Sequence, residues 1–164
     1  QMFEWVGEGF HELTSLKLGT WSRAKAVGRT VARLDWNLDG KADLVVGLMD
    51  SPHFILTNTS QTAANEFLSI RLVATDSARD AIGTTITATI GGSHFMHQLT
   101  AGDGYASGNE RRLYLGCGSA RKIDKLSIVW PSGVSQTFID VPVSQSIISI
   151  EGQELFTTSQ HPIQ

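Results

Sequence analysis

Residues 85–92 read Thr-Ile-Thr-Ala-Thr-Ile-Gly-Gly. Isoleucine and alanine alternate here with threonine, and successive side chains of a β-strand point to opposite faces of a sheet. The stretch therefore predicts a strand with one apolar face and one hydrophilic face. The two glycines that follow predict a two-residue hairpin turn into a second strand.

The same alternation recurs on both sides of this stretch. Residues 68–72 and 126–130 alternate in the same way, and Pro131-Ser132-Gly133 predicts a tight turn directly after the second run. Short strands separated by turns are typical of an all-β fold, and we predict an antiparallel β-sandwich. A short helical piece is expected only at residues 24–32. The other candidate strands cover residues 44–48, 54–58, 95–99, 112–115 and 146–151.

Composition excludes several classes of protein. The 164 residues carry 41% hydrophobic and 18% charged side chains, which is ordinary for a folded domain. The net charge of −3 gives no basic footprint, so we expect no nucleic-acid partner. No apolar run approaches the roughly 20 residues of a membrane helix, so we expect no membrane insertion. The single cysteine, Cys117, rules out an internal disulfide framework.

One stretch has the pattern of a metal-binding loop. Residues 35–43 read Asp-Trp-Asn-Leu-Asp-Gly-Lys-Ala-Asp, with oxygen-bearing side chains at loop positions 1, 3, 5 and 9. Calcium prefers about six to eight hard oxygen ligands, and a tight loop with glycine at position 6 supplies them in this way. The predicted Ca²⁺ ligands are Asp35, Asn37, Asp39, the backbone carbonyl of Lys41, and Asp43.

Three other interpretations of this loop are an EF-hand, an acidic β-turn and a magnesium site. An EF-hand is excluded because its glutamate position is occupied by Val46. An acidic β-turn would use the same residue types, but four oxygen positions in register favour a cation. Magnesium prefers a smaller and more hydrated site than this loop predicts.

The loop and its flanks resemble one FG-GAP repeat of the VCBS type. Residues 28–34 lead into the loop and residues 44–47 leave it, and the loop matches the form DxNxDGxxDL at Asp35, Asn37, Asp39, Asp43 and Leu44. The resemblance implies a blade of a β-propeller, appended to the sandwich. One blade cannot close a propeller, so either preceding blades are missing or this segment packs elsewhere. The start Gln1-Met2-Phe3 is interpreted as that of a fragment of a larger protein.

Residues 65–152 resemble the ASPIC/UnbV domain, which is found after FG-GAP repeats in cartilage acidic protein and its bacterial relatives. The departures are Cys117, where an aliphatic residue is commoner, and Asp103, where a small one is. The resemblance implies an extracellular or cell-envelope setting and no established reaction. The matching phrases are Arg79-Asp80-Ala81-Ile82-Gly83, Ala101-Gly102-Asp103-Gly104-Tyr105, Asn109-Glu110-Arg111-Arg112-Leu113, Leu115-Gly116-Cys117-Gly118 and Ile128-Val129-Trp130-Pro131-Ser132-Gly133.

We therefore divide the chain into a repeat region with the calcium loop at residues 1–58, a sandwich domain at 65–152 and a C-terminal tail at 153–164. Residues 59–64 are small and polar, as in a linker. How residues 1–27 pack is left open.

A second polar cluster is the candidate ligand surface of the sandwich. Loops on a rigid scaffold commonly carry recognition. The simpler interpretation, which we prefer, is that Arg111 or Arg112 pairs with Asp80 or Glu110. The candidate residues of this surface are Asp103, Tyr105, Asn109 and Arg111.

The remaining motifs favour structural roles. His94 and His97 are spaced three apart, so on a strand they point to opposite faces and do not share an ion. Cys117 is interpreted as a small buried thiol. Ser119 and Lys122 lack the helix that an S-x-x-K nucleophile needs, and residues 102–108 lack the spacing of a phosphate loop.

These observations predict a non-catalytic, calcium-binding module for adhesion or binding, secreted or held in the cell envelope, with an unknown protein or carbohydrate ligand. The alternative is a carbohydrate-binding sandwich, which needs an exposed aromatic platform near Tyr105 or Trp36. A hydrolase fragment ranks last, because the sequence offers no acid and base pair with supporting context.

Overall fold

The computed structural model describes residues 2–14, 19–23, 25–60, 66–153 and 155–157. These residues form strands and one short 3-10 helix, η1 (Thr20–Arg23), and contain no α-helix. No helix in this part of the chain is long and apolar enough to cross a membrane. The strands are β1 (Phe3–Val6), β2 (Gly9–Glu12), β3 (Gly28–Leu34), β4 (Asp43–Leu48), β5 (Phe54–Leu56), β6 (Glu66–Val73), β7 (Thr85–Ile90), β8 (Ser93–Gln98), β9 (Leu113–Gly118), β10 (Lys122–Val129), β11 (Ser135–Pro142), β12 (Gln145–Ile150) and β13 (Leu155–Thr157).

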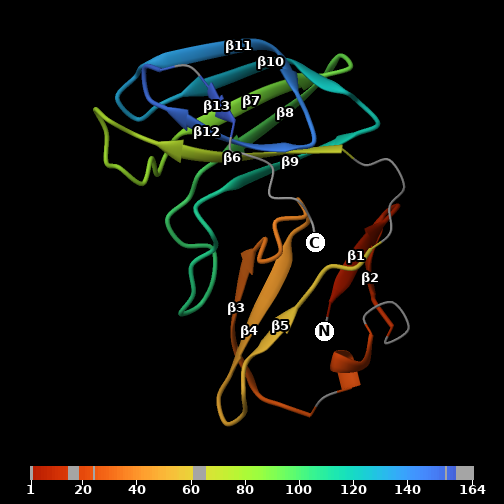
Figure 1. Cartoon of the computed structure of the whole chain (residues 1–164). Helices are drawn as coiled ribbons and strands as arrows, with labels where there is room; N and C mark the ends of the chain where they lie inside the picture. The colour runs from red at the N-terminus through yellow and green to blue at the C-terminus, as the bar shows by residue number, and fades with distance from the viewer. Residues whose placement is uncertain (1, 15–18, 24, 61–65, 154, 158–164) are drawn as a thin grey trace.

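Two four-stranded sheets form a sandwich, shown in the upper half of Figure 1. One sheet has the order β11-β10-β7-β8 and the other has the order β13-β12-β6-β9. The apolar residues of the alternating runs meet in one core, in which Ile70, Ile86 and Ile128 are fully buried. The predicted all-β sandwich is thus confirmed, and the alternation in the sequence places its core.

One strand pair departs from the predicted antiparallel arrangement. β12 lies parallel to β6, with Gln145 opposite Leu68 and Ile150 opposite Val73. Parallel neighbours need a long crossover connection, and here β7 to β11 supply it.

The opening stretch folds as its pattern predicts. β7 and β8 pair around Gly91 and Gly92, whose φ angles of 55° and 82° suit a two-residue hairpin turn. β11 was not among the predicted strands, because most of its side chains are exposed and its polar residues resemble a loop.

The helical prediction for residues 24–32 is wrong at every described residue, because residues 25–27 form no helix and a strand follows them. β3 begins at Gly28, and its backbone pairs with β4, which overrides the weak local preference for helix. Ala24 lies outside the described residues.

The first part of the chain forms a separate small unit. β3, β4 and β5 make a three-stranded antiparallel sheet, and β1 and β2 make a hairpin. In Figure 1 this sheet lies below the sandwich, and the described residues form no propeller. β13 joins the second sheet of the sandwich, beyond the predicted boundary at residue 152. Residues 61–65, 154 and 158–164, which include most of the predicted linker and tail, lie outside the described residues.

Candidate functional site

The predicted calcium loop connects β3 to β4 at the end of the small sheet that faces the sandwich (Figure 1). Its ends are held together by the strand pair of Leu34 and Asp43. Leu38 and Gly40 have positive φ angles of 60° and 82°, which reverse the chain within the loop. Glycine takes this conformation at no steric cost, whereas Leu38 takes it under strain.

Asp35 is buried, with 6% of its surface exposed. Its carboxylate accepts hydrogen bonds from the backbone N–H of Asp39 at 3.0 Å and of Gly40 at 2.8 Å. Burial raises the pKa of Asp35 above its ordinary value, the two backbone hydrogen bonds oppose this rise, and the charges of Asp39 and Asp43 add to it.

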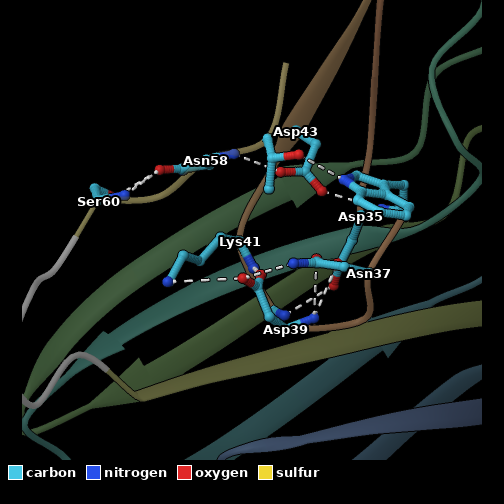
Figure 2. A network of polar contacts seen from close by, with 10 residues as sticks. Asp35, Asn37, Asp39, Lys41, Asp43, Asn58 and Ser60 are labelled. Carbon is cyan, nitrogen blue, oxygen red and sulfur yellow. Dashed lines mark hydrogen bonds and ion pairs between the residues drawn. The ribbon is translucent and has the colours of Figure 1, made fainter. Parts of the chain in front are cut away.

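Asp43 is completely buried at the start of β4. Its Oδ2 accepts a hydrogen bond from the backbone N–H of Trp36 at 3.1 Å, and its Oδ1 accepts one from Asn58 at 2.7 Å. Asp43 therefore ties the loop to the chain that leaves β5, as Figure 2 shows.

The outer ligands of the predicted set contact one another. The Asp39 carboxylate accepts hydrogen bonds from the Lys41 backbone N–H at 2.9 Å and from Asn37 Nδ2 at 3.1 Å. Lys41 Nζ lies 3.7 Å from Asp39 Oδ2. In Figure 2 Asp39 lies below Asp35 and Asp43, with Asn37 beside it.

The chemistry of this donor set fits a calcium ion. An ionised carboxylate has about four lone-pair sites, so Asp35 and Asp43, which each accept two hydrogen bonds, retain acceptor capacity. As the side chains now lie, however, no three acidic, imidazole or thiol groups in the described residues are close enough to share a metal ion. An ion bound by all three aspartates therefore requires at least one of them to turn away from its present partner.

The sandwich packs directly against this loop. A Cβ atom added to Gly40 would lie 2.2 Å from the ring of Phe67, a residue of β6. The Glu110 carboxylate accepts hydrogen bonds from the Asp35 backbone N–H at 3.3 Å and from the Tyr114 hydroxyl at 2.5 Å. The first residue of the loop is thereby tied to the sandwich, and burial together with Glu110 raises the pKa of Tyr114.

The second predicted surface lies on the segment that connects β8 to β9, and this segment covers the free edge of β3. The Glu110 backbone N–H donates to the Arg33 carbonyl at 2.9 Å, and Arg33 N–H donates to Asn109 Oδ1 at 2.8 Å. Ser107 Oγ donates to the Val31 carbonyl at 2.8 Å. The segment is therefore fixed along β3 by hydrogen bonds to backbone atoms of that strand.

Each of the four candidate ligand residues has a partner within the chain. Asp103 accepts a hydrogen bond from Asn109 Nδ2 at 2.8 Å, and hydrogen bonds from Thr100 and Asn109 lower the pKa of Asp103. The Tyr105 ring, 70% exposed, has the Arg29 guanidinium 5.0 Å from its centroid. Arg111 Nη1 donates to the Thr100 carbonyl at 3.1 Å.

The ion pair of the simpler interpretation is present for Arg112, whose Nε lies 3.1 Å from Glu110 Oε1. Arg112 Nη1 also donates to Ser69 Oγ at 3.1 Å, which anchors Glu110 to β6 of the sandwich. Glu110 is thus bonded to both units at once.

We expect Glu110→Ala to lower the free energy of unfolding by about 1–3 kcal/mol, because the Asp35 N–H, the Tyr114 hydroxyl and the Arg112 guanidinium lose one shared acceptor. Glu110→Gln retains an acceptor oxygen and should lose less. Urea unfolding of both variants measures the difference. Equal losses in the two variants would show that the shared acceptor is unimportant.

Glu151 is a buried polar centre that the sequence analysis did not identify. It follows β12 directly and is 3% exposed. Its Oε2 accepts hydrogen bonds from the backbone N–H groups of Thr75 at 2.8 Å, Asp76 at 2.9 Å and Ser77 at 3.2 Å. Its Oε1 accepts one from the Ser132 hydroxyl. Only the lone acidic residue at the end of an apolar strand could have indicated this role.

The remaining motifs occupy structural positions. His94 and His97 lie three residues apart on β8, so their side chains point to opposite faces of the sheet. His94 Nδ1 lies 3.0 Å from Thr89 Oγ1. Cys117 is buried, and burial raises the pKa of its thiol. Lys122 pairs with Asp140 at 2.5 Å.

The fold and the loop define an all-β sandwich module joined to a small sheet that carries an acidic loop. Residues 74–155 match the family model described as ASPIC and UnbV, and the chain belongs to this family. The match covers most of the sandwich and leaves the acidic loop outside it. No curated protein matches the chain.

Proposed function

We propose that this chain is a non-catalytic, calcium-binding module for binding or adhesion, secreted or held in the cell envelope. In this proposal it is the C-terminal part of a larger protein with FG-GAP repeats of the VCBS type, and its ligand is a protein or a carbohydrate. The acidic loop resembles the calcium loop of such repeats, and the family of the sandwich is one found after them.

The observation that carries the calcium proposal is the position of the loop. Asp35 and Asp43 are buried carboxylates of a loop that packs against the sandwich, and a cation would offset the cost of burying their negative charge. Asp35, Asn37, Asp39, the Lys41 carbonyl and Asp43 would hold the ion. A bound calcium ion would supply positive charge and fix the side chains that line the loop.

Calcium in this proposal has a structural role. A ligand that binds only the folded chain stabilises it by about 2.7 kcal/mol at a hundredfold excess over its dissociation constant. Because the loop contacts Phe67 and Glu110, this stabilisation would also hold the small sheet against the sandwich.

Calorimetric titration of metal-stripped protein with calcium, with magnesium as competitor, tests the proposal. We expect one site in the wild type, a rise in its melting temperature with calcium, and loss of both in Asp39→Ala. Asp50→Ala is the matched control, because Asp50 is exposed in the same unit and outside the loop. The calcium proposal fails if no heat is observed, or if wild type and Asp39→Ala respond equally.

A further inference from the structure

β8 is an edge strand with unusual exposure. It lies at the end of the sheet order β11-β10-β7-β8, and all six of its residues are exposed. Phe95 is 43% exposed and Met96 is 74% exposed. The strand contains no lysine, arginine, aspartate, glutamate or proline. Edges of this kind are templates for pairing with another strand.

The hydrogen-bonding groups on the free side of β8 can be assigned. A two-residue hairpin turn makes Ile90 and Ser93 a hydrogen-bonded pair, and the bond from the Leu99 N–H to the Thr84 carbonyl at 2.9 Å continues the same ladder. Odd-numbered residues of β8 therefore bond to β7. The N–H and C=O groups of His94, Met96 and Gln98 point away from β7.

The other sheet edges in the described residues carry devices that oppose pairing. β11 has Asp140 at a positive φ of 55° and ends at Pro142, and the β6–β9 pair has a bulge beside Glu66. β5 and β13 have three residues each, and β3 is covered by the segment that contains Asn109. β1 and β2 each include a glutamate. Such features protect edges from strand addition, and β8 has none of them.

We propose that β8 pairs with β8 of a second copy of this chain, antiparallel about a two-fold axis at Met96, which joins the two sheets into one. This register sets Met96 opposite Met96 and His94 opposite Gln98 of the second copy. It is the register in which all three residues with outward backbone groups exchange hydrogen bonds. A second copy fits because this edge brings no like charges together, and its most exposed apolar side chain, Met96, meets its own equivalent. This proposal is independent of the calcium proposal.

A single short strand pair buries little surface, so the dimer is weak and depends on concentration. Sedimentation equilibrium of the full chain over about 1–500 µM tests it, together with amide hydrogen exchange at low and high concentration. We expect reversible dimerisation and concentration-dependent protection of the amides of His94, Met96 and Gln98. A monomer throughout this range, or a dimer that leaves these amides unprotected, would overturn the proposal.

Two pairs of variants locate the interface. Met96→Lys should raise the dimer dissociation constant by at least about tenfold, whereas Ile139→Lys should not. Ile139 is 62% exposed on the same outer face of the sheet, at the opposite edge. Met96→Cys should form a disulfide between copies, because directly opposed residues have Cα atoms about 5.5 Å apart. Gln98→Cys should not, because its mate is residue 94. Dimers insensitive to Met96→Lys would place the contact elsewhere.

Discussion

Gly40→Ala should lower the free energy of unfolding by about 2–5 kcal/mol. The left-handed backbone at this position costs a residue with a Cβ atom about 1–2 kcal/mol. The remainder comes from overpacking against Phe67, which typically costs about 1–3 kcal/mol. The added Cβ would meet the ring at 2.2 Å. Because Phe67 belongs to the sandwich, the substitution strains the contact between the two units, and urea unfolding measures its cost.

Gly152→Ala separates the two parts of this effect. Gly152 has a φ of 77°, close to the 82° of Gly40, but an added Cβ there would meet no atom within 4 Å. It should therefore show the conformational cost alone. Combining Gly40→Ala with Phe67→Leu should recover part of the loss in a double-mutant cycle. Equal losses of unfolding free energy in the two glycine variants would mean that the Phe67 ring moves aside without cost. The loop would then not be tightly packed on the sandwich.

Glu151→Ala should lower the melting temperature at neutral pH by at least about 5 °C, because three backbone N–H groups lose their acceptor in a buried setting. Hydrogen bonds from Ser132 and from the backbone N–H groups of residues 75–77 hold the pKa of Glu151 at about 2, below its ordinary value of 4.5. A lowered pKa in the folded state stabilises the fold above the unfolded-state value. This stabilisation disappears as the pH falls from 4.5 towards 2.

The pH dependence provides the decisive comparison. Thermal melts of wild type and Glu151→Gln between pH 7 and pH 2 should differ most above pH 4.5 and converge towards pH 2. Glu66→Gln is a control in the same sheet, because Glu66 is the first residue of β6 and, among the described residues, its carboxylate contacts the Ser144 hydroxyl and the Arg121 guanidinium rather than a set of backbone N–H groups. A gap between wild type and Glu151→Gln that stays constant with pH would show that the carboxylate charge does not contribute.

The sandwich was predictable because apolar and polar residues alternate along most of its strands. The alternate apolar residues of these strands enter one core, as their period of two requires; they are Leu68, Ile70 and Leu72 of β6, Ile86, Ala88 and Ile90 of β7, and Leu126 and Ile128 of β10. β11 was not predictable in the same way, because its exposed residues carry no such pattern. The parallel pairing of β6 with β12 could not be derived either, because it depends on contacts between residues far apart in the sequence.

The acidic loop was predictable as a unit but its surroundings were not. The spacing of Asp35, Asp39 and Asp43 placed them in one tight loop between two strands. The packing of Gly40 on Phe67 and the bonds of Glu110 to both units arise from the tertiary fold. Local sequence patterns carry no information about such contacts. For the same reason the polar residues 103–111, proposed from sequence as a ligand surface, also make contacts with β3.

The parallel pair of β6 and β12 also bears on how the chain folds during synthesis. β6 lies between β12 and β9, so its sheet lacks a central neighbour until residues 145–150 are available. Pairing over such a long sequence separation is slow, because much chain entropy is lost before the contact forms. On the ribosome, β6 can pair with β9, but its other edge must wait until β12 has emerged from the exit tunnel. During that interval the unpaired backbone edge of β6 is exposed, which is the kind of edge that chaperones protect.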